Sequence, residues 1–324
     1  MPTRRSCRGA ARAALFVCFA ASLLGCSTAP WPSTPVRANE MIAFDATQGQ
    51  LSEGLALRDG SAYLSFASSG EVARLDLANR QMSTYSSLPK PDASTGFLSG
   101  LAFDGNDLYA GLVSFSPATQ PGIYRVTTPG QAARLFASDP GMVFPNGLLF
   151  DGNGQLYVTD SAAGAIFRIA RDGTVVKWAS DPLLAGNKDY CGAGKGVGVP
   201  FDIGANGIVR KGDSFYITNT DQSTVIRIPI DGSGSAGKAT VFAGPDCRQL
   251  SGADGLAVAP DGALIVASNH LNVLARVDEA GHVGTLLAGE PLDFPTSLTF
   301  DGNALYVNSF ALLDMRNPGL VRIR

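Results

Sequence analysis

The fold is decided by a short stretch near the middle of the chain, Gly147-Leu-Leu-Phe150 followed by Leu156-Tyr-Val-Thr159. A small residue opens an apolar strand, a turn rich in Asp, Gly and Asn follows, and a second apolar strand returns. The pattern occurs six times, and its first residue is in turn Gly54, Gly100, Gly147, Gly207, Gly255 and Ser297. A pattern that recurs at such intervals is typical of an array built from one supersecondary unit.

Each repeat continues with two more apolar segments, which in the third repeat are 165–169 and 175–178. Four short strands divided by Asp-Gly and Gly-Asn turns are typical of a propeller blade. The sequence therefore predicts an all-β fold, a six-bladed β-propeller over residues 41–324 with four antiparallel strands in each blade.

The sixth repeat ends after its third strand, 320–324. We expect the N-terminal segment 41–45, Met-Ile-Ala-Phe-Asp, to supply the missing outer strand of this last blade. Such a closure removes the exposed sheet edge between the last blade and the first.

Composition excludes several classes of protein. Apolar residues make up 45% of the 324 residues and charged residues 16%, so the chain has enough apolar side chains for a large core and is not disordered. The formal net charge of −3 gives no reason to expect a nucleic-acid partner. We expect a monomer that acts on a small molecule.

The first residues predict export rather than folding. Four arginines, at positions 4, 5, 8 and 12, precede an apolar run from Ala13 to Leu24, which is too short to span a bilayer. Residues 1–25 are therefore a predicted signal peptide. Cys26 follows the expected cleavage point as in a bacterial lipobox, so it is the predicted site of lipidation. Residues 26–40, with three prolines, are the predicted tether.

These features place the protein at the bacterial cell envelope, as a periplasmic or outer-membrane lipoprotein held to the membrane only by its lipid. Ordinary secretion is the alternative. Of the remaining cysteines, only Cys191 and Cys247 lie outside the signal, and an oxidising compartment favours a disulfide between them. Cys191 lies in an insertion, 181–200, which the bridge would pin over one face of the propeller.

One position is polar in all six repeats: the residue just before the first strand, which in a propeller faces the central channel. It is occupied by Glu53, Ser99, Asn146, Asn206, Asp254 and Thr296. Two carboxylates in a poorly solvated channel are costly unless a cation neutralises them. Oxygens from Glu, two Asn and Asp suit a hard ion, most readily Ca²⁺, and the lack of His and Cys disfavours zinc and copper. Asn-Gly and Asp-Gly are also common turn dipeptides, so each pair taken alone predicts a turn.

The ordered set across repeats one, three, four and five resembles the senescence marker protein/gluconolactonase family, whose relatives include diisopropyl fluorophosphatase and the paraoxonases. The resemblance covers about residues 41–324. It implies that Glu53, Asn146, Asn206 and Asp254 bind one divalent cation, and that Asp254 also acts as base or nucleophile in hydrolysis. Because a directly bound cation lowers the pKa of a carboxyl, Asp254 would work through a lengthened metal contact or a water.

Four further residues are predicted to bind substrate, namely Ser99, Thr296, Asn269 and His270. His270 is one of only two histidines, so the histidine pair of paraoxonases has no counterpart. The favoured function is a calcium-dependent hydrolase of small cyclic esters, a lactonase. One alternative is a non-catalytic binding or scaffold propeller, suggested by the Asn269-His270-Leu271 string. Another is a lyase like those that inactivate streptogramins, for which His270 would be the catalytic residue.

Overall fold

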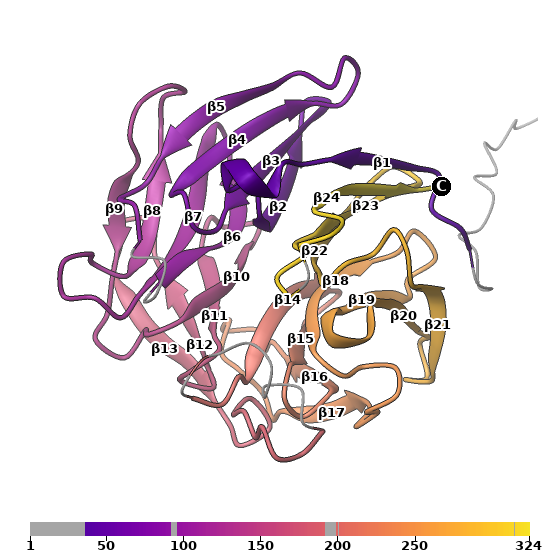
Figure 1. Cartoon of the computed structure of the whole chain (residues 1–324). Coiled ribbons are helices and arrows are strands. Elements are labelled where there is room, and N and C mark those ends of the chain that lie inside the picture. The colour runs from indigo at the N-terminus through magenta and orange to yellow at the C-terminus, as the bar shows by residue number, and fades with distance from the viewer. Residues whose placement is uncertain (1–35, 92–95, 192–198, 200, 314) are drawn as a thin grey trace, which may run out of the picture. The chain divides into compact units, whose positions relative to one another are not determined.

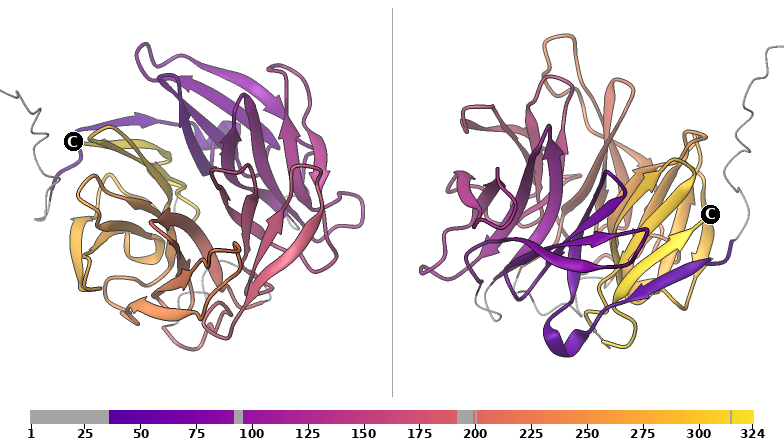
Figure 2. Two further views of the ribbon diagram at one scale, coloured as in Figure 1. Left: turned by 180° about the vertical axis from the view of Figure 1, so that it is seen from behind. Right: turned by 90° about the horizontal axis from the view of Figure 1, so that it is seen from above.

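The computed structural model describes residues 36–91, 96–191, 199, 201–313 and 315–324. These residues form six four-stranded antiparallel sheets arranged around a common axis (Figure 1; Figure 2). The predicted signal peptide 1–25 and the lipidation site Cys26 lie outside the described residues. No helix in the described part of the chain is long and apolar enough to cross a membrane.

Each sheet takes its strands in chain order from the axis outward. The first three sheets are β2 (Ser52–Arg58), β3 (Ser61–Phe66), β4 (Glu71–Asp76), β5 (Met82–Ser87); β6 (Gly96–Asp104), β7 (Asp107–Ser114), β8 (Gly122–Val126), β9 (Arg134–Ala137); and β10 (Pro145–Phe150), β11 (Leu156–Asp160), β12 (Ala165–Ile169), β13 (Val175–Ser180). The next two are β14 (Ala205–Lys211), β15 (Ser214–Asn219), β16 (Thr224–Pro229), β17 (Thr240–Ala243); and β18 (Ala253–Val258), β19 (Leu264–Ser268), β20 (Val273–Val277), β21 (Val283–Ala288).

The last sheet combines the first strand of the chain with its last three. It contains β22 (Pro295–Asp301), β23 (Ala304–Ser309), β24 (Gly319–Ile323) and, outermost, β1 (Glu40–Ala43), which lies beside β24 in Figure 1. Met41 pairs with Val321 and Ile42 with Leu320 in an antiparallel ladder. The predicted closure of the last blade by the N-terminal strand is confirmed.

The bounds of that strand differ from the predicted 41–45. It begins at Glu40 and ends at Ala43, because Asp45 caps the 3₁₀ turn η1 (Ala46–Gln48) by accepting a hydrogen bond from the Thr47 backbone N–H at 2.9 Å. The predicted tether 26–40 is also too long at its C-terminal end. There the Val36 N–H donates to the carbonyl oxygen of Leu286, and Val36 and Ala38 pack against the core between the last two blades.

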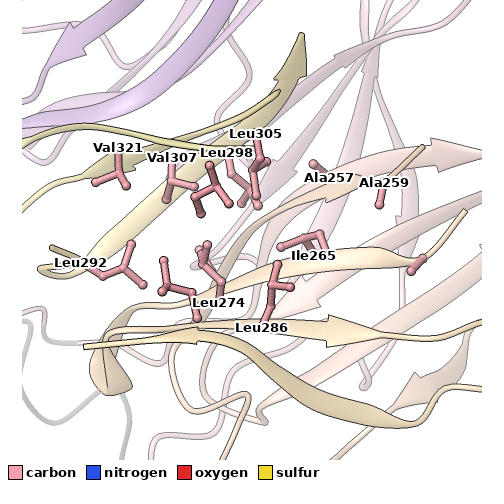
Figure 3. Close-up of a cluster of buried hydrophobic side chains, with 14 residues drawn as sticks. Ala257, Ala259, Ile265, Leu274, Leu286, Leu292, Leu298, Leu305, Val307 and Val321 are labelled. Atoms are coloured by element: carbon pink, nitrogen blue, oxygen red, sulfur yellow. The ribbon is translucent and has the colours of Figure 1, made fainter. Parts of the chain in front are cut away.

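The core lies between neighbouring blades. One cluster combines Ile265, Leu274 and Leu286 of the fifth blade with Leu305 and Val321 of the sixth (Figure 3). Second strands such as β3 are buried along their whole length, since both faces of the sheet are covered, whereas outer strands such as β13 contain only exposed and half-buried residues. The stability of the fold therefore depends on blade-to-blade contact all around the ring.

A tyrosine that recurs in the second strand adds contacts between blades. Tyr109 of the second blade meets Phe150 of the third edge to face, with ring centroids 4.9 Å apart. Tyr157 of the third blade meets Phe215 of the fourth at 4.6 Å. Pairs of this geometry are worth about 0.5–1.5 kcal/mol beyond their buried area, so the recurring Leu-Tyr motif has a packing role.

Candidate metal centre

The six polar residues predicted to face the channel lie at an irregularity that is repeated in every inner strand. The ladder between first and second strands changes register at this point in all six blades, for example between Pro145 and Leu148 in the third. All six residues are buried, with at most a few per cent of their surface exposed. Neighbouring inner strands contact one another, and β22 contacts β2, so the six positions form a closed ring. We call these six residues the channel ring.

The Asn-Gly and Asp-Gly pairs of the channel ring are not turns. They lie inside strands, and the glycine is required by a close approach between blades. A Cβ atom on Gly147 would lie 2.6 Å from the carbonyl oxygen of Asn206, and one on Gly54 would lie 2.3 Å from that of Ser99. The glycine that follows five of the six ring residues thus lets the next blade's backbone come near the axis.

Hydroxyls of the second strands hold these backbones in place. In the third blade, Thr159 Oγ1 accepts a hydrogen bond from the Gly147 N–H at 2.8 Å and donates to the carbonyl oxygen of Asn206. Thr218 repeats this in the fourth blade, between the Gly207 N–H and the carbonyl oxygen of Asp254. Each hydroxyl therefore links one blade's strand to the ring residue of the next blade.

A second pair of hydroxyls orients the two ring amides. Asn146 Nδ2 lies 3.1 Å from Ser161 Oγ, which in turn lies 2.8 Å from the carbonyl oxygen of Ala205. A carbonyl oxygen can only accept, so the single hydroxyl hydrogen of Ser161 goes there, and the hydroxyl must accept from Asn146. The amide nitrogen is thereby fixed towards Ser161, which leaves the amide oxygen for another partner.

The fourth blade has the same arrangement. Asn206 Nδ2 donates to Thr220 Oγ1 at 3.0 Å, and Thr220 Oγ1 donates to the carbonyl oxygen of Ala253 at 2.9 Å. Both asparagines thus keep the group that a cation binds, the carbonyl oxygen, free of these hydroxyls. Oriented oxygen donors on neighbouring blades are what a hard-cation site requires.

The two ring carboxylates influence each other although they come from the first and fifth blades. Burial, and then the charge of Asp254, raise the pKa of the Glu53 carboxyl well above its usual range. Burial raises the pKa of Asp254 to about 7, against hydrogen bonds from Asn269 and Asn206 that lower it. Without a cation the ring therefore favours protonated carboxyls, as expected for like charges taken out of water.

The donor set fits a hard divalent cation. No group of three or more His, Cys, Asp or Glu side chains that could hold a metal is present among the described residues. The channel ring instead combines two carboxylates with two amides whose orientation is fixed. Carboxylate and amide oxygens are ligands of Ca²⁺, and a cation would remove the cost of burying two carboxylates together. The assignment of Glu53, Asn146, Asn206 and Asp254 as ligands stays a prediction.

The other two ring residues use their hydroxyls inside the fold. Ser99 Oγ donates to the carbonyl oxygen of Pro145 at 2.6 Å, and Thr296 Oγ1 donates to that of Glu53 at 2.9 Å. Each side chain thus links its own blade to the next. Because both hydroxyl hydrogens are used, each side-chain oxygen can only accept a hydrogen bond from a ligand. The substrate role of Ser99 and Thr296 stays a prediction.

Asn269 and His270 lie together in the short 3₁₀ turn η3 (Asn269–Leu271) that follows β19. Asn269 Nδ2 donates to Asp254 Oδ2 at 3.0 Å, so Asn269 touches the predicted catalytic carboxyl directly. His270 is half-buried, with its ring 5.6 Å from that of Phe294, and its buried Nε2 has no hydrogen-bond partner in the described part of the chain. Burial lowers the pKa of His270, which favours the neutral imidazole.

The predicted disulfide is present. Cys191 and Cys247 are bonded, with Cα atoms 5.4 Å apart, and the bridge joins the connections that precede β14 and β18. Much of the predicted lid, residues 192–198 and 200, lies outside the described residues, so its role stays a prediction. The bridge closes a loop of 56 residues, which on the chain-entropy model stabilises the fold by up to about 4 kcal/mol.

A separate cavity of about 170 Å³ opens at the other end of the inner strands, between the second and third blades. Asp104, Arg125 and Arg171 are among its lining residues, and no channel-ring residue is. Arg125 is already paired with Asp107. The cavity therefore does not contribute to the candidate metal centre.

Reasoning from sequence missed the hydroxyls that support the channel ring. They form the strings Thr159-Asp160-Ser161 and Thr218-Asn219-Thr220, one in each of the two blades that carry a ring asparagine. In a strand, residues two apart point to the same side, so a repeated hydroxyl-x-hydroxyl pattern after an apolar strand was the available signal.

Comparison with known proteins supports the fold and the family. Residues 203–311 match the family model described as the SMP-30/Gluconolactonase/LRE-like region. Regucalcin from Agrobacterium tumefaciens, a calcium-binding protein, is 19% identical with a TM-score of 0.62 over 90% of this chain and 94% of that chain. Virginiamycin B lyase from Staphylococcus aureus is 18% identical, with a TM-score of 0.54 over 83% of this chain and 81% of that one.

A luciferin-regenerating enzyme is also similar, at 15% identity and a TM-score of 0.62 over 87% of this chain and 95% of that chain. At these identities the solved structures show a common fold. No curated protein matches the chain in sequence. The resemblance inferred from the sequence is confirmed: the chain is a six-bladed β-propeller that carries the SMP-30/gluconolactonase/LRE-like region.

Proposed function

We propose that this protein is a divalent-cation-dependent hydrolase of small cyclic esters. The observation that supports the proposal is the channel ring, which contains two buried carboxylates and two amides whose nitrogens are held by Ser161 and Thr220. The family region and the likeness to a calcium-binding propeller agree with it.

Glu53, Asn146, Asn206 and Asp254 would hold the cation, with Ca²⁺ as the expected ion. Bound there, the cation supplies Lewis-acid polarisation of an ester carbonyl. The protein's own residues desolvate the site and orient its ligands. Burial of the channel ring excludes bulk water, and the Ser161 and Thr220 hydroxyls keep both amide oxygens available.

Asp254 is the proposed base: it takes a proton from the water that attacks the ester carbonyl carbon, and returns it to the alkoxide oxygen released when the ring C–O bond breaks. Asn269 Nδ2 donates to Asp254 Oδ2 and so fixes the carboxyl in one orientation. In the metal-free protein, burial raises the pKa of Asp254 to about 7. A bound cation would lower this pKa, so Asp254 would act as a base through a lengthened metal contact or an intervening water.

The test is a panel of lactones of increasing ring size, assayed with added Ca²⁺ and with a chelator. The account expects turnover that the chelator abolishes, and a loss of kcat of about 10³-fold or more in Asp254→Asn, which keeps the shape of the side chain. Asp172→Asn, the same change in an exposed turn, is the control and should leave kcat unchanged. Bound Ca²⁺ without turnover of any lactone would favour the scaffold alternative instead.

One observation favours a second candidate, a lyase. His270 is half-buried, and burial lowers its pKa, which favours the neutral imidazole. Its Nε2 has no hydrogen-bond partner among the described residues and lies beside Asn269 in the chain, so it is suitable for removing a proton from carbon. A streptogramin added to the same panel tests it: elimination that is lost in His270→Ala would replace the hydrolase proposal, whereas its absence would leave the hydrolase.

A further inference from the structure

Four phenylalanines form a cluster at the end of the propeller from which the inner strands start. Phe144 is at its centre: its ring centroid lies 5.1 Å from that of Phe97, 5.5 Å from that of Phe201 and 6.4 Å from that of Phe115. The Phe115 and Phe201 centroids are 5.4 Å apart. We call these four residues the phenylalanine cluster; they come from the second, third and fourth blades.

The chain places the phenylalanine cluster beside the channel ring. Phe97 precedes Ser99 by two residues in β6, and Phe144, just before β10, precedes Asn146 by two residues. Residues two apart along an extended chain are about 7 Å from each other. The Phe144 N–H donates to Asp160 Oδ2 at 2.7 Å, which fixes this segment against the second strand.

The cluster is buried on one side and open on the other. Phe144 is 4% exposed, whereas Phe115 is 44% exposed and has two rings of the cluster beside it. Val143, next to Phe144, is exposed as well. Phe97 also packs against a buried cluster that contains Phe294 and Phe310 of the sixth blade. An open apolar surface next to a polar site is a common feature of sites for small molecules with an apolar part.

We propose that the phenylalanine cluster binds an apolar side chain of the ester substrate, so that the substrates are lactones that carry an alkyl or aryl substituent. This inference rests on the proposed function. A carbonyl at the channel ring places the first few carbons of a substituent within about 7 Å, the distance that separates Asn146 from Phe144 along the chain. A sugar-like lactone, covered with hydroxyls, would leave those groups unpaired against the rings.

The experiment compares γ-lactones whose side chain grows from none to eight carbons, in wild type, Phe115→Ala and Leu135→Ala. Leu135 is the matched control, because it is also 44% exposed but lies on the outer strand β9. In wild type, kcat/KM should rise about twofold to fourfold for each added methylene. Phe115→Ala should lower kcat/KM about tenfold for the longest lactone, chiefly through KM, and leave the unsubstituted lactone unchanged. A wild type without chain-length preference, or equal losses in both variants, would overturn the inference.

A binding measurement separates this inference from the proposed function. The γ-lactam with an eight-carbon side chain cannot be turned over as an ester, and its dissociation constant is measured by calorimetry for the same three proteins. If no lactone is hydrolysed, the proposed function fails, but lactam binding that is weakened only in Phe115→Ala still supports the apolar subsite. Lactam binding that is absent in wild type, or equal in all three, refutes the subsite.

Discussion

The channel ring contains two kinds of position that share one backbone geometry. In the third and fourth blades the ring residue is an asparagine whose nitrogen is held by Ser161 or Thr220. In the second and sixth blades it is Ser99 or Thr296, and its hydroxyl donates to the backbone of the next blade. The register change in the inner strand is the same in all four.

The difference follows from the second strand. The residues that correspond to Ser161 and Thr220 in the second and sixth blades are Val113 and Phe310, which offer no hydroxyl. An asparagine at either ring position would lack a hydroxyl that accepts from its amide nitrogen. Ser99 and Thr296 occupy these positions, and their hydroxyls donate to backbone carbonyl oxygens of the next blade. Within the channel ring, an asparagine is thus found only where a hydroxyl just after the second strand can accept from its amide nitrogen.

The largest effect is expected from a substitution that disrupts the close approach of neighbouring blades at the channel ring. In Gly147→Ala the new methyl would lie 2.6 Å from the carbonyl oxygen of Asn206, so the blades must move apart and the free energy of unfolding should fall by about 3 kcal/mol. Gly152→Ala is the control, because a Cβ there meets nothing within 4 Å. Urea unfolding measures both, and equal stability of the two variants would refute the close approach.

The next prediction removes one supporting hydroxyl. Thr220→Val keeps the shape of the side chain but takes away the acceptor for Asn206 Nδ2, so Ca²⁺ affinity should fall about 10- to 100-fold. Thr224→Val makes the same change in the same blade, at a buried hydroxyl that has no hydrogen-bond partner among the described residues, and should leave affinity unchanged. Calorimetric titration of both variants decides, and an unaltered affinity in Thr220→Val would mean that the hydroxyl does not prepare the site.

Ca²⁺ affinity and stability, both measured as a function of pH, test the role of the two carboxyl positions of the ring. Because burial raises the pKa of Asp254 to about 7 and also raises that of Glu53, protons compete with the cation, and Ca²⁺ affinity should fall at least about tenfold for each pH unit below 7. The folded state of the metal-free protein binds these protons more tightly than the unfolded state. Its stability should therefore decrease as pH rises from about 4 to 7, and added Ca²⁺ should reverse that trend. Melting temperatures that do not depend on pH under chelator would contradict this.

The smallest effect concerns the two structural hydroxyls. Ser99→Ala removes the bond to the carbonyl oxygen of Pro145, and should lower the free energy of unfolding by about 1 kcal/mol while Ca²⁺ affinity changes less than about threefold. Thermal unfolding and calcium titration on one sample measure both. A large loss of affinity would place Ser99 among the ligands and remove the distinction between the two kinds of position.

Much of the fold could be predicted from the sequence because the repeat fixes it. Six occurrences of a small residue followed by an apolar strand and its partner strand determine the number of blades, and they give Asn146 and Asp254 the same position in their own blades. The closure by the N-terminal strand followed from the incomplete sixth repeat. The ends of that strand did not, since they depend on Asp45 capping η1 through one local hydrogen bond.

The site was predicted less completely. The ring residues share a position in the repeat and can be found by comparing repeats, but Ser161 and Thr220 act across strands and have counterparts in only some blades. The phenylalanine cluster could not be found by comparing the repeats. Phe115 and Phe201 lie outside the strands, and only the fold brings their rings together with that of Phe144.

The most direct test of the account is a calcium titration by calorimetry of the purified protein and its Glu53→Gln and Asp254→Asn variants. The account predicts one Ca²⁺ per chain in wild type, and an affinity lowered more than about 100-fold by either substitution, with Asp172→Asn unchanged. A wild type that binds no calcium at millimolar concentration, or variants that bind it as well as wild type, would contradict a shared cation in the channel ring.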